Sequence, residues 1–75
     1  MNVIVDARGV SKEERDLLIG TAIRKADTGE IVVLADDEAA SEDISEAAGK
    51  HGWVLKGQEC KGDRYRVTLS PTFSP

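Results

Sequence analysis

The sequence holds very little of the chemistry that builds metal or disulfide sites. Its 75 residues include one cysteine, Cys60, and one histidine, His51. One thiol cannot form an internal disulfide, and one thiol with one imidazole cannot supply the ligands of a zinc site within a single chain. The acidic run 36–38 lacks the alternating ligands and the glycine of a calcium loop. We therefore expect no metal and, in so short a chain, no large buried cofactor.

Long apolar runs are also missing. The longest charge-free stretches, 17–23 and 67–75, fall far short of the roughly 20 apolar residues that span a bilayer. Asp6 and Arg8 interrupt the N-terminal stretch before an apolar signal-peptide core can form. These features predict a cytoplasmic protein that does not bind membranes.

Basic and aromatic residues are few. Fourteen acidic residues against ten basic ones give a net charge of −4, and 4% of the residues are aromatic. This balance disfavours general affinity for nucleic acid. The run Arg64-Tyr65-Arg66 interleaves basic and aromatic residues as some RNA-binding surfaces do, but strand alternation turns Tyr65 inward and leaves two arginines outside.

Short apolar runs alternate with amphipathic stretches along the chain. Strands are expected at four places: 2–6, 31–35, 53–59 and 63–70. A helix over 12–26 is expected to begin with a capping box, in which the Ser11 hydroxyl and the Glu14 carboxylate each accept the other residue's amide hydrogen. Its apolar stripe, which packs on the sheet, consists of Leu18, Ile19, Ala22, Ile23 and Ala26.

A second helix follows the acidic run 36–38. Ser41 or Asp37 is expected to cap it. Lys50 and His51 would lie in its last turn, where positive charge favours the carbonyl end, and Gly52 would take the left-handed position beyond it. Its apolar stripe consists of Ala40, Ile44, Ala47, Ala48 and His51.

The order β-α-β-α-β-β predicts an α+β fold. We expect a two-layer α/β sandwich, with two helices on one face of a four-stranded mixed sheet. The turn of the last hairpin is placed at 60–62. One domain is expected over 1–70, followed by a flexible tail at 71–75 that contains two prolines and cannot extend the sheet. Because the strand 31–35 is apolar on both sides, two of its residues must face away from the helices.

Several segments, in order, resemble the TusA/SirA-like sulfur-carrier family. They are 5–11 (VDARGVS), 29–37 (GEIVVLADD), 41–44 (SEDI) and 50–52 (KHG). The resemblance spans about residues 3–69 and implies the same two-layer fold. It also implies a carrier that accepts a persulfide from a cysteine desulfurase and passes the sulfur toward tRNA thiolation or cofactor synthesis.

The chain departs from that family at the carrier site. The family's cysteine lies in a Cys-Pro-x-Pro motif at the start of the first helix, where free amides and the helix dipole stabilise a thiolate. Here Lys12 stands at the cysteine position, Glu13 at the first proline position and Arg15 at the second. Glu13 and Glu14 also place carboxylates over the amides that would hold an incoming anion. We therefore expect no catalytic residue and no persulfide at this site.

A protein-interaction module without carrier activity is the function that these residues favour. The residues expected to meet a partner are Arg8, Lys12, Glu13 and Arg15. The resemblance implies a cysteine desulfurase or another sulfur-relay protein as that partner. Ordinary structural roles stand beside this one, because Lys12 can pair with Asp16 four residues on and Arg8 can pair with Asp6 or Glu13.

Two alternatives stay open. Cys60, with Lys61 beside it, would make the chain an active sulfur carrier or transferase, although Glu59 and Asp63 oppose thiolate formation. The first three strands of the family fold are parallel, which would place this hairpin at the same end of the sheet as the loop before the first helix. The other alternative is an RNA-binding or oligomeric module that uses the open sheet face; we expect a monomer or a weak homodimer.

Overall fold

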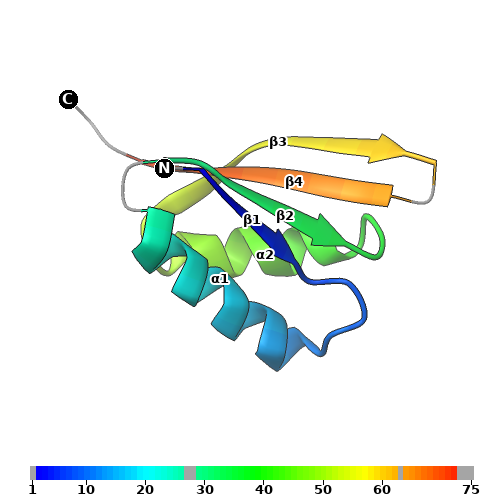
Figure 1. Cartoon of the computed structure of the whole chain (residues 1–75), viewed down its shortest axis with the longest axis horizontal. Helices are drawn as coiled ribbons and strands as arrows, with labels where there is room; N and C mark the ends of the chain where they lie inside the picture. Colours follow the sequence, from blue (N-terminus) through cyan, green and yellow to red (C-terminus); the bar gives the residue numbers. More distant parts are fainter. Residues whose placement is uncertain (1, 27–28, 63, 73–75) are drawn as a thin grey trace.

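The computed structural model describes residues 2–26, 29–62 and 64–72. Along these residues the structure has the α+β order that the sequence predicts. Its elements are β1 (Val3–Asp6), α1 (Lys12–Ala26), β2 (Ile31–Ala35), α2 (Ala40–Gly49), β3 (Trp53–Lys61) and β4 (Arg64–Pro71). Both helices lie on one side of the sheet (Figure 1), so the predicted two-layer sandwich is confirmed.

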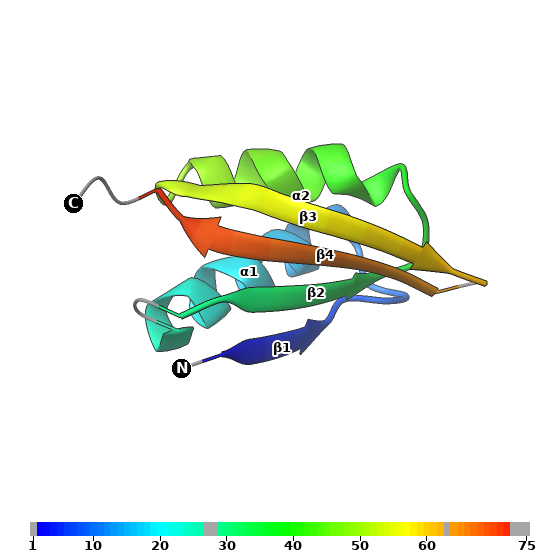
Figure 2. The same ribbon diagram turned by 90° about the horizontal axis from the view of Figure 1, so that it is seen from above.

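The sheet has four strands in the order β1-β2-β4-β3. The strand β1 pairs with β2 in parallel, whereas β4 pairs antiparallel with both β2 and β3. Hence β1, β2 and β3 all run in one direction, and their carboxyl ends lie at the same end of the sheet (Figure 2), as expected. The loop before α1, the loop before α2 and the β3–β4 hairpin therefore meet at one end of the molecule.

The core lies between the helices and one face of the sheet. Ile31 and Val33 of β2 are fully buried there, whereas Val32 and Leu34 are half-buried on the opposite face. The strand β4 follows the predicted alternation, with Tyr65, Val67 and Leu69 in the core. The helices contribute the two predicted stripes, except for His51: Ile19, Ala22, Ile23 and Ala26 from α1, with Leu18 partly buried, and Ala40, Ile44, Ala47 and Ala48 from α2.

The two helices begin differently. The helix α1 starts at Lys12 as predicted, and Ser11 Oγ accepts a hydrogen bond from the Glu14 amide (3.2 Å). The prediction for α2 was wrong, because its N-cap is Ala39 and no side chain caps it. Asp37 contributes its backbone carbonyl instead, which accepts from the Ala40 amide (3.3 Å), and Ser41 lies inside the helix.

The end of α2 also differs from the prediction. The helix ends at Gly49, so Lys50 and His51 lie beyond its last turn, and His51 is exposed. Glycine favours helix termination. Tight turns follow, in which the His51 and Gly52 amides donate three residues back, and Gly52 then adopts the expected left-handed conformation with φ 76°.

The hairpin is longer than predicted. The strand β3 continues to Lys61, so Cys60 and Lys61 pair with β4 instead of forming the turn. A β-bulge at Lys56 adds one residue to β3. The strand β4 includes Pro71, which has no amide hydrogen to donate. No hydrogen bond to β2 is lost there, because β2 pairs with β4 only as far as Leu69.

Part of the expected tail is bound to the domain. The Thr72 amide donates to the Gly52 carbonyl (3.0 Å). Residues 73–75, which hold the rest of that tail, lie outside the described part of the chain, as does Asp63. Neither helix of the described residues combines the length and the apolar character of a bilayer-spanning segment.

Candidate functional site

The loop between β1 and α1 is held by two carboxylates. The Arg8 guanidinium donates to both oxygens of Asp6 (2.9 Å each), and the Gly9 amide donates to Asp36 Oδ2 (2.9 Å). Gly9 has φ 73°, a backbone conformation that favours glycine. The hydrogen bonds from the Arg8 side chain and amide lower the pKa of Asp6 to about 2. The loop is therefore tied to β1 at one point and to the end of β2 at another.

Lys12 occupies the first helical position after this loop. Its ammonium lies 3.4 Å from Asp16 Oδ2, and its side chain is 53% exposed. The ion pair four residues along the helix that the sequence suggested is therefore formed. A protonated lysine with a carboxylate partner is a poor nucleophile. The position where the resembling family has its cysteine thus holds a cation in an ordinary surface pair.

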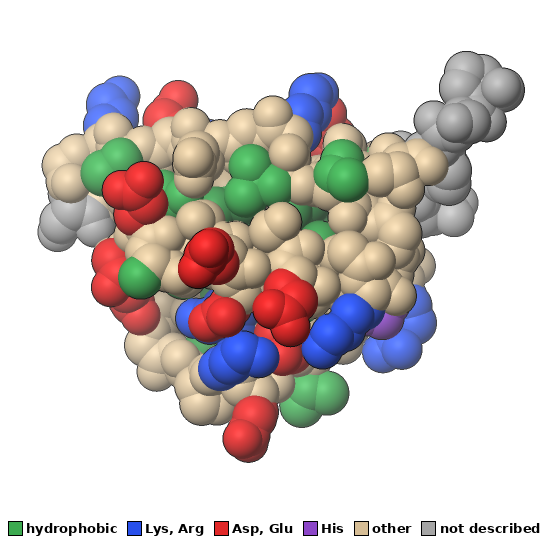
Figure 3. Space-filling view, turned by 180° about the vertical axis from the view of Figure 1, so that it is seen from behind, with side chains coloured by type: hydrophobic (Ala, Val, Ile, Leu, Met, Phe, Trp, Pro, Cys, Tyr) green, Lys and Arg blue, Asp and Glu red, His purple; other side chains and the backbone are tan. Residues whose placement is uncertain are grey.

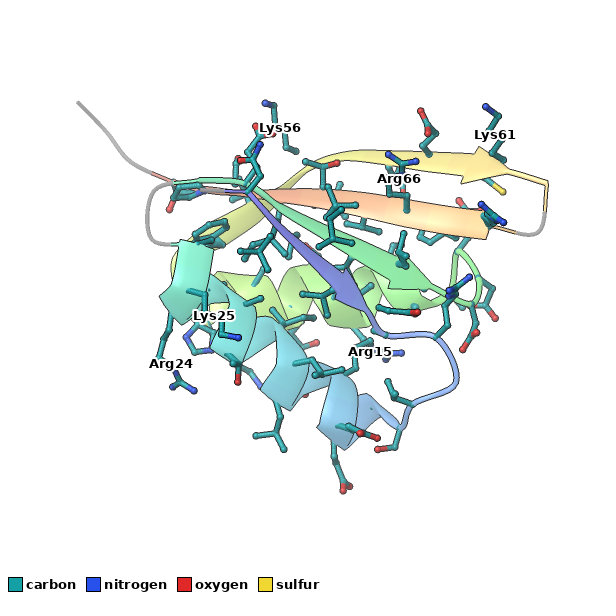
Figure 4. The ribbon with its side chains drawn as sticks, viewed as in Figure 1. Arg15, Arg24, Lys25, Lys56, Lys61 and Arg66 are labelled. Carbon is teal, nitrogen blue, oxygen red and sulfur yellow. The ribbon has the colours of Figure 1, made fainter. Side chains whose placement is uncertain are left out.

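Two other residues of the predicted partner surface lie in different settings. Glu13 is exposed beside Lys12. Arg15 lies between the two helices (Figure 4), where its guanidinium is 3.0 Å from Asp43 Oδ2 and its side chain is 12% exposed. Arg15 therefore links α1 to α2, whereas Arg8, Lys12 and Glu13 stay accessible at the surface.

Cys60 lies in β3 opposite Tyr65, and it is exposed. Because Tyr65 belongs to the core face, Cys60 is on the helix side of the sheet, beyond the part that the helices cover. Its sulfur is 3.8 Å from the Gly62 carbonyl oxygen. The hairpin that carries it is at the same end of the sheet as the loop before α1, as the parallel strands require.

The sheet face turned away from the helices, called the open face below, carries a hollow of about 540 Å³. Its floor is apolar and is formed by Ile4, Val32 and Leu34. Four basic side chains surround it, here named the basic rim: Arg8, Lys61, Arg64 and Arg66. Figure 4 shows Lys61 and Arg66 projecting from the sheet away from the helices. The hollow therefore combines an apolar surface with a cationic border.

Three cations of the basic rim form no ion pair within the part of the chain that the structure describes. The side chains of Lys61, Arg64 and Arg66 form no hydrogen bond or ion pair with any described residue. Glu59 also lines the hollow and stands opposite Arg66 in the β3–β4 register, but the two do not pair. Acidic side chains gather over α2 in the helical layer (Figure 3), and its first turn holds Glu42 and Asp43.

Sequence reasoning found parts of this hollow but not the whole. Alternation along β4 places Arg64 and Arg66 on the open face. It does not bring Arg8 and Lys61 to them, because that needs the strand order and the hairpin register. The grouping of the four basic residues could have been predicted from the expected parallel direction of the first three strands, because all four lie at the end of the sheet where those strands end.

The remaining candidates do not form a site. The His51 ring lies against Gly20 of α1. A Cβ atom added to Gly20 would be 3.4 Å from Nε2 of His51. Within residues 2–26, 29–62 and 64–72, no group of three or more His, Cys, Asp or Glu side chains is placed to hold a metal ion.

Comparison with known proteins adds no family to these observations. No protein-family model matches the chain, and no curated protein matches it.

Proposed function

We propose that the chain is a protein-interaction module of the sulfur-relay kind that carries no sulfur at the start of α1. The basic rim is the observation that carries this proposal. Three of its cations lack an ion-pair partner among the described residues, and they surround an apolar floor. Such a surface suits a partner segment that brings carboxylates to the cations and aliphatic side chains to the floor.

The start of α1 supports the absence of carrier activity. Lys12 has no thiol and forms a surface pair with Asp16. Glu13 and Glu14 lie in the first turn, where their charge opposes a persulfide anion. The resemblance implies a cysteine desulfurase or another relay protein as partner. Arg8 joins the two regions, because it belongs to the basic rim and to the loop that precedes Lys12.

A protein partner fits the open face better than a nucleic acid does. Single-stranded nucleic acid is usually held by aromatic side chains that stack on its bases. Trp53 and Tyr65, the aromatic residues of the described part of the chain, are both buried. The net charge of −4 adds general repulsion of a polyanion.

The docking surface is tested by reversing charge on the open face. We expect Arg64→Glu with Arg66→Glu to weaken binding of a cysteine desulfurase at least about tenfold, measured by calorimetry or surface-based binding. The matched control also reverses two charges, Arg24→Glu with Lys50→Glu, both at exposed residues of the helical layer. Equal binding by the open-face variant and the wild-type protein would refute docking at the basic rim.

Sulfur carriage is tested separately by intact mass. After incubation with a desulfurase and cysteine, we expect the chain to gain no sulfur atom. A gain that disappears in Cys60→Ser would establish the alternative carrier. A gain that persists in Cys60→Ser would place the sulfur elsewhere and would also contradict the proposal.

RNA binding is the remaining alternative for the open face. Salt-sensitive retention of RNA, lost in Arg64→Ala with Arg66→Ala, would replace a protein partner by a nucleic acid. We expect no such retention.

A further inference from the structure

The outer edge of β1 presents unpaired backbone groups. The Val3 and Ala7 amides donate to the Glu30 and Leu34 carbonyls, toward β2. Because backbone groups alternate along a strand, the amide and carbonyl of Ile4 point away from the sheet. In the strand order β1 is an edge strand, so no strand of the described chain pairs with that side. Such an edge is a template for another strand.

The most exposed large apolar side chains lie along this same edge. Ile4 of β1 and Leu17 of α1 are each 72% exposed. Both line a hollow of about 480 Å³ between β1 and α1, named the β1 groove below. An edge strand flanked by exposed aliphatic side chains offers both hydrogen bonds and apolar area to a partner.

The charges of the β1 groove make it complementary to itself. Glu14 lies in the first part of α1 and Lys25 in its last turn, and both line the groove. Neither side chain has an ion-pair partner among the described residues. A second copy arranged antiparallel brings Glu14 of each protomer toward Lys25 of the other. An isologous dimer requires a self-complementary patch, and an apolar centre with opposite charges at its two ends is such a patch.

We propose that the chain forms a two-fold homodimer in which the β1 strands of two copies pair antiparallel. The two-fold axis lies at Ile4, so that the two Ile4 side chains meet across it and Asp6 faces Asn2 of the second copy. This register pairs the outward backbone groups of Ile4 and avoids placing Ile4 opposite a carboxylate. The sheet then continues through both protomers, and Ile4, which also lines the open-face hollow, packs against its copy at one side of that hollow.

The other edge of the sheet is less suited to pairing. The strand β3 carries a bulge at Lys56, and Lys61 stands near its end. Bulges and lysines are features by which edge strands avoid pairing with other chains. The two edges therefore differ, and the dimer uses the regular one. Its formation does not depend on docking at the basic rim.

Charge exchange between two variants tests the dimer. We expect wild-type protein to associate reversibly in sedimentation equilibrium. Lys25→Glu and Glu14→Lys each convert both cross-dimer attractions into repulsions, and each should weaken self-association at least about tenfold. An equal mixture of the two variants restores attraction at both ends and should associate as the wild-type protein does. Both positions are exposed, so the variants are expected to fold.

Arg24→Glu is the matched control, because Arg24 is exposed next to Lys25 but does not line the β1 groove. It should associate as the wild type does. Wild-type protein that stays monomeric at every accessible concentration would overturn the proposal. So would unchanged association of Lys25→Glu, failure of the mixture to associate, or an equal loss in Arg24→Glu.

Discussion

The two faces of β2 consist of similar side chains in opposite environments. Ile31 and Val33 are completely buried against the helices, whereas Val32 and Leu34 remain half-buried on the open face. Only the parity of a residue in the strand decides which face it meets. The helix-covered face accounts for the core, and the open face keeps apolar area that folding alone does not use. That unused area is where the basic rim stands.

The largest expected difference between the faces is in stability. We expect Ile31→Ala to lower the free energy of unfolding by about 3 kcal/mol, because it leaves a cavity in the core. Leu34→Ala removes as much side chain from the open face and should cost about 1 kcal/mol or less, since solvent can fill the space. Urea unfolding of both variants measures this. Equal costs would mean that the open face is as well packed as the core.

A smaller difference is expected between two arginines. Arg15 is 12% exposed and pairs with Asp43 across the helices, so Arg15→Gln should lower the free energy of unfolding by about 1 kcal/mol. Arg66 is exposed and pairs with no described residue, so Arg66→Gln should change that free energy by less than about 0.5 kcal/mol. Chemical unfolding of both variants measures these changes. A double-mutant cycle with Asp43→Asn separates the energy of the Arg15–Asp43 ion pair from the packing energy of the Arg15 side chain. A larger loss in Arg66→Gln would reverse this assignment.

The smallest effect concerns pH. Hydrogen bonds from Arg8 lower the pKa of Asp6 from 3.8 to about 2. A carboxyl with a lowered folded-state pKa contributes stability above its unfolded pKa, and that contribution is lost as the pH falls from about 4 to about 2. We expect Arg8→Gln to return the pKa of Asp6 toward 3.8 and to remove this part of the pH dependence. A carbon-detected NMR titration of Asp6 in both proteins checks it; the same low pKa in Arg8→Gln would contradict the assigned cause.

The sequence predicts the fold well because short-range patterns determine most of it. The range 12–26 is a helix and 31–35 a strand within the bounds that periodicity indicated. Alternation also assigned Tyr65 to the core and Arg66 to the open face. Each of these inferences needs only neighbours in sequence. The prediction of the start of α2 was wrong. Asp37 and Ser41 are both good capping residues, but their side-chain preference did not decide where the helix begins.

The candidate site was less predictable because its parts are far apart in sequence. Arg8 and Arg64 meet at one hollow only through the strand order β1-β2-β4-β3. Composition could not show this, since a net charge of −4 conceals a local excess of cations. Arg15, expected at a partner surface, forms an interhelical pair because α2 packs beside α1. An ion pair between residues this far apart in the sequence can be identified only from the tertiary structure.

The bulge at Lys56 determines which side chains of the second half of β3 lie on the open face and which lie on the helical side. One extra residue inverts the orientation of every residue that follows it in the strand. In an unbulged strand, Glu59 and Lys61 would turn toward the helical layer and Cys60 would stand among the arginines. Loss of the bulge at constant sequence would therefore bring the thiol into the cationic hollow, whereas deletion of Lys56 would leave Cys60 opposite Tyr65, on the helical side.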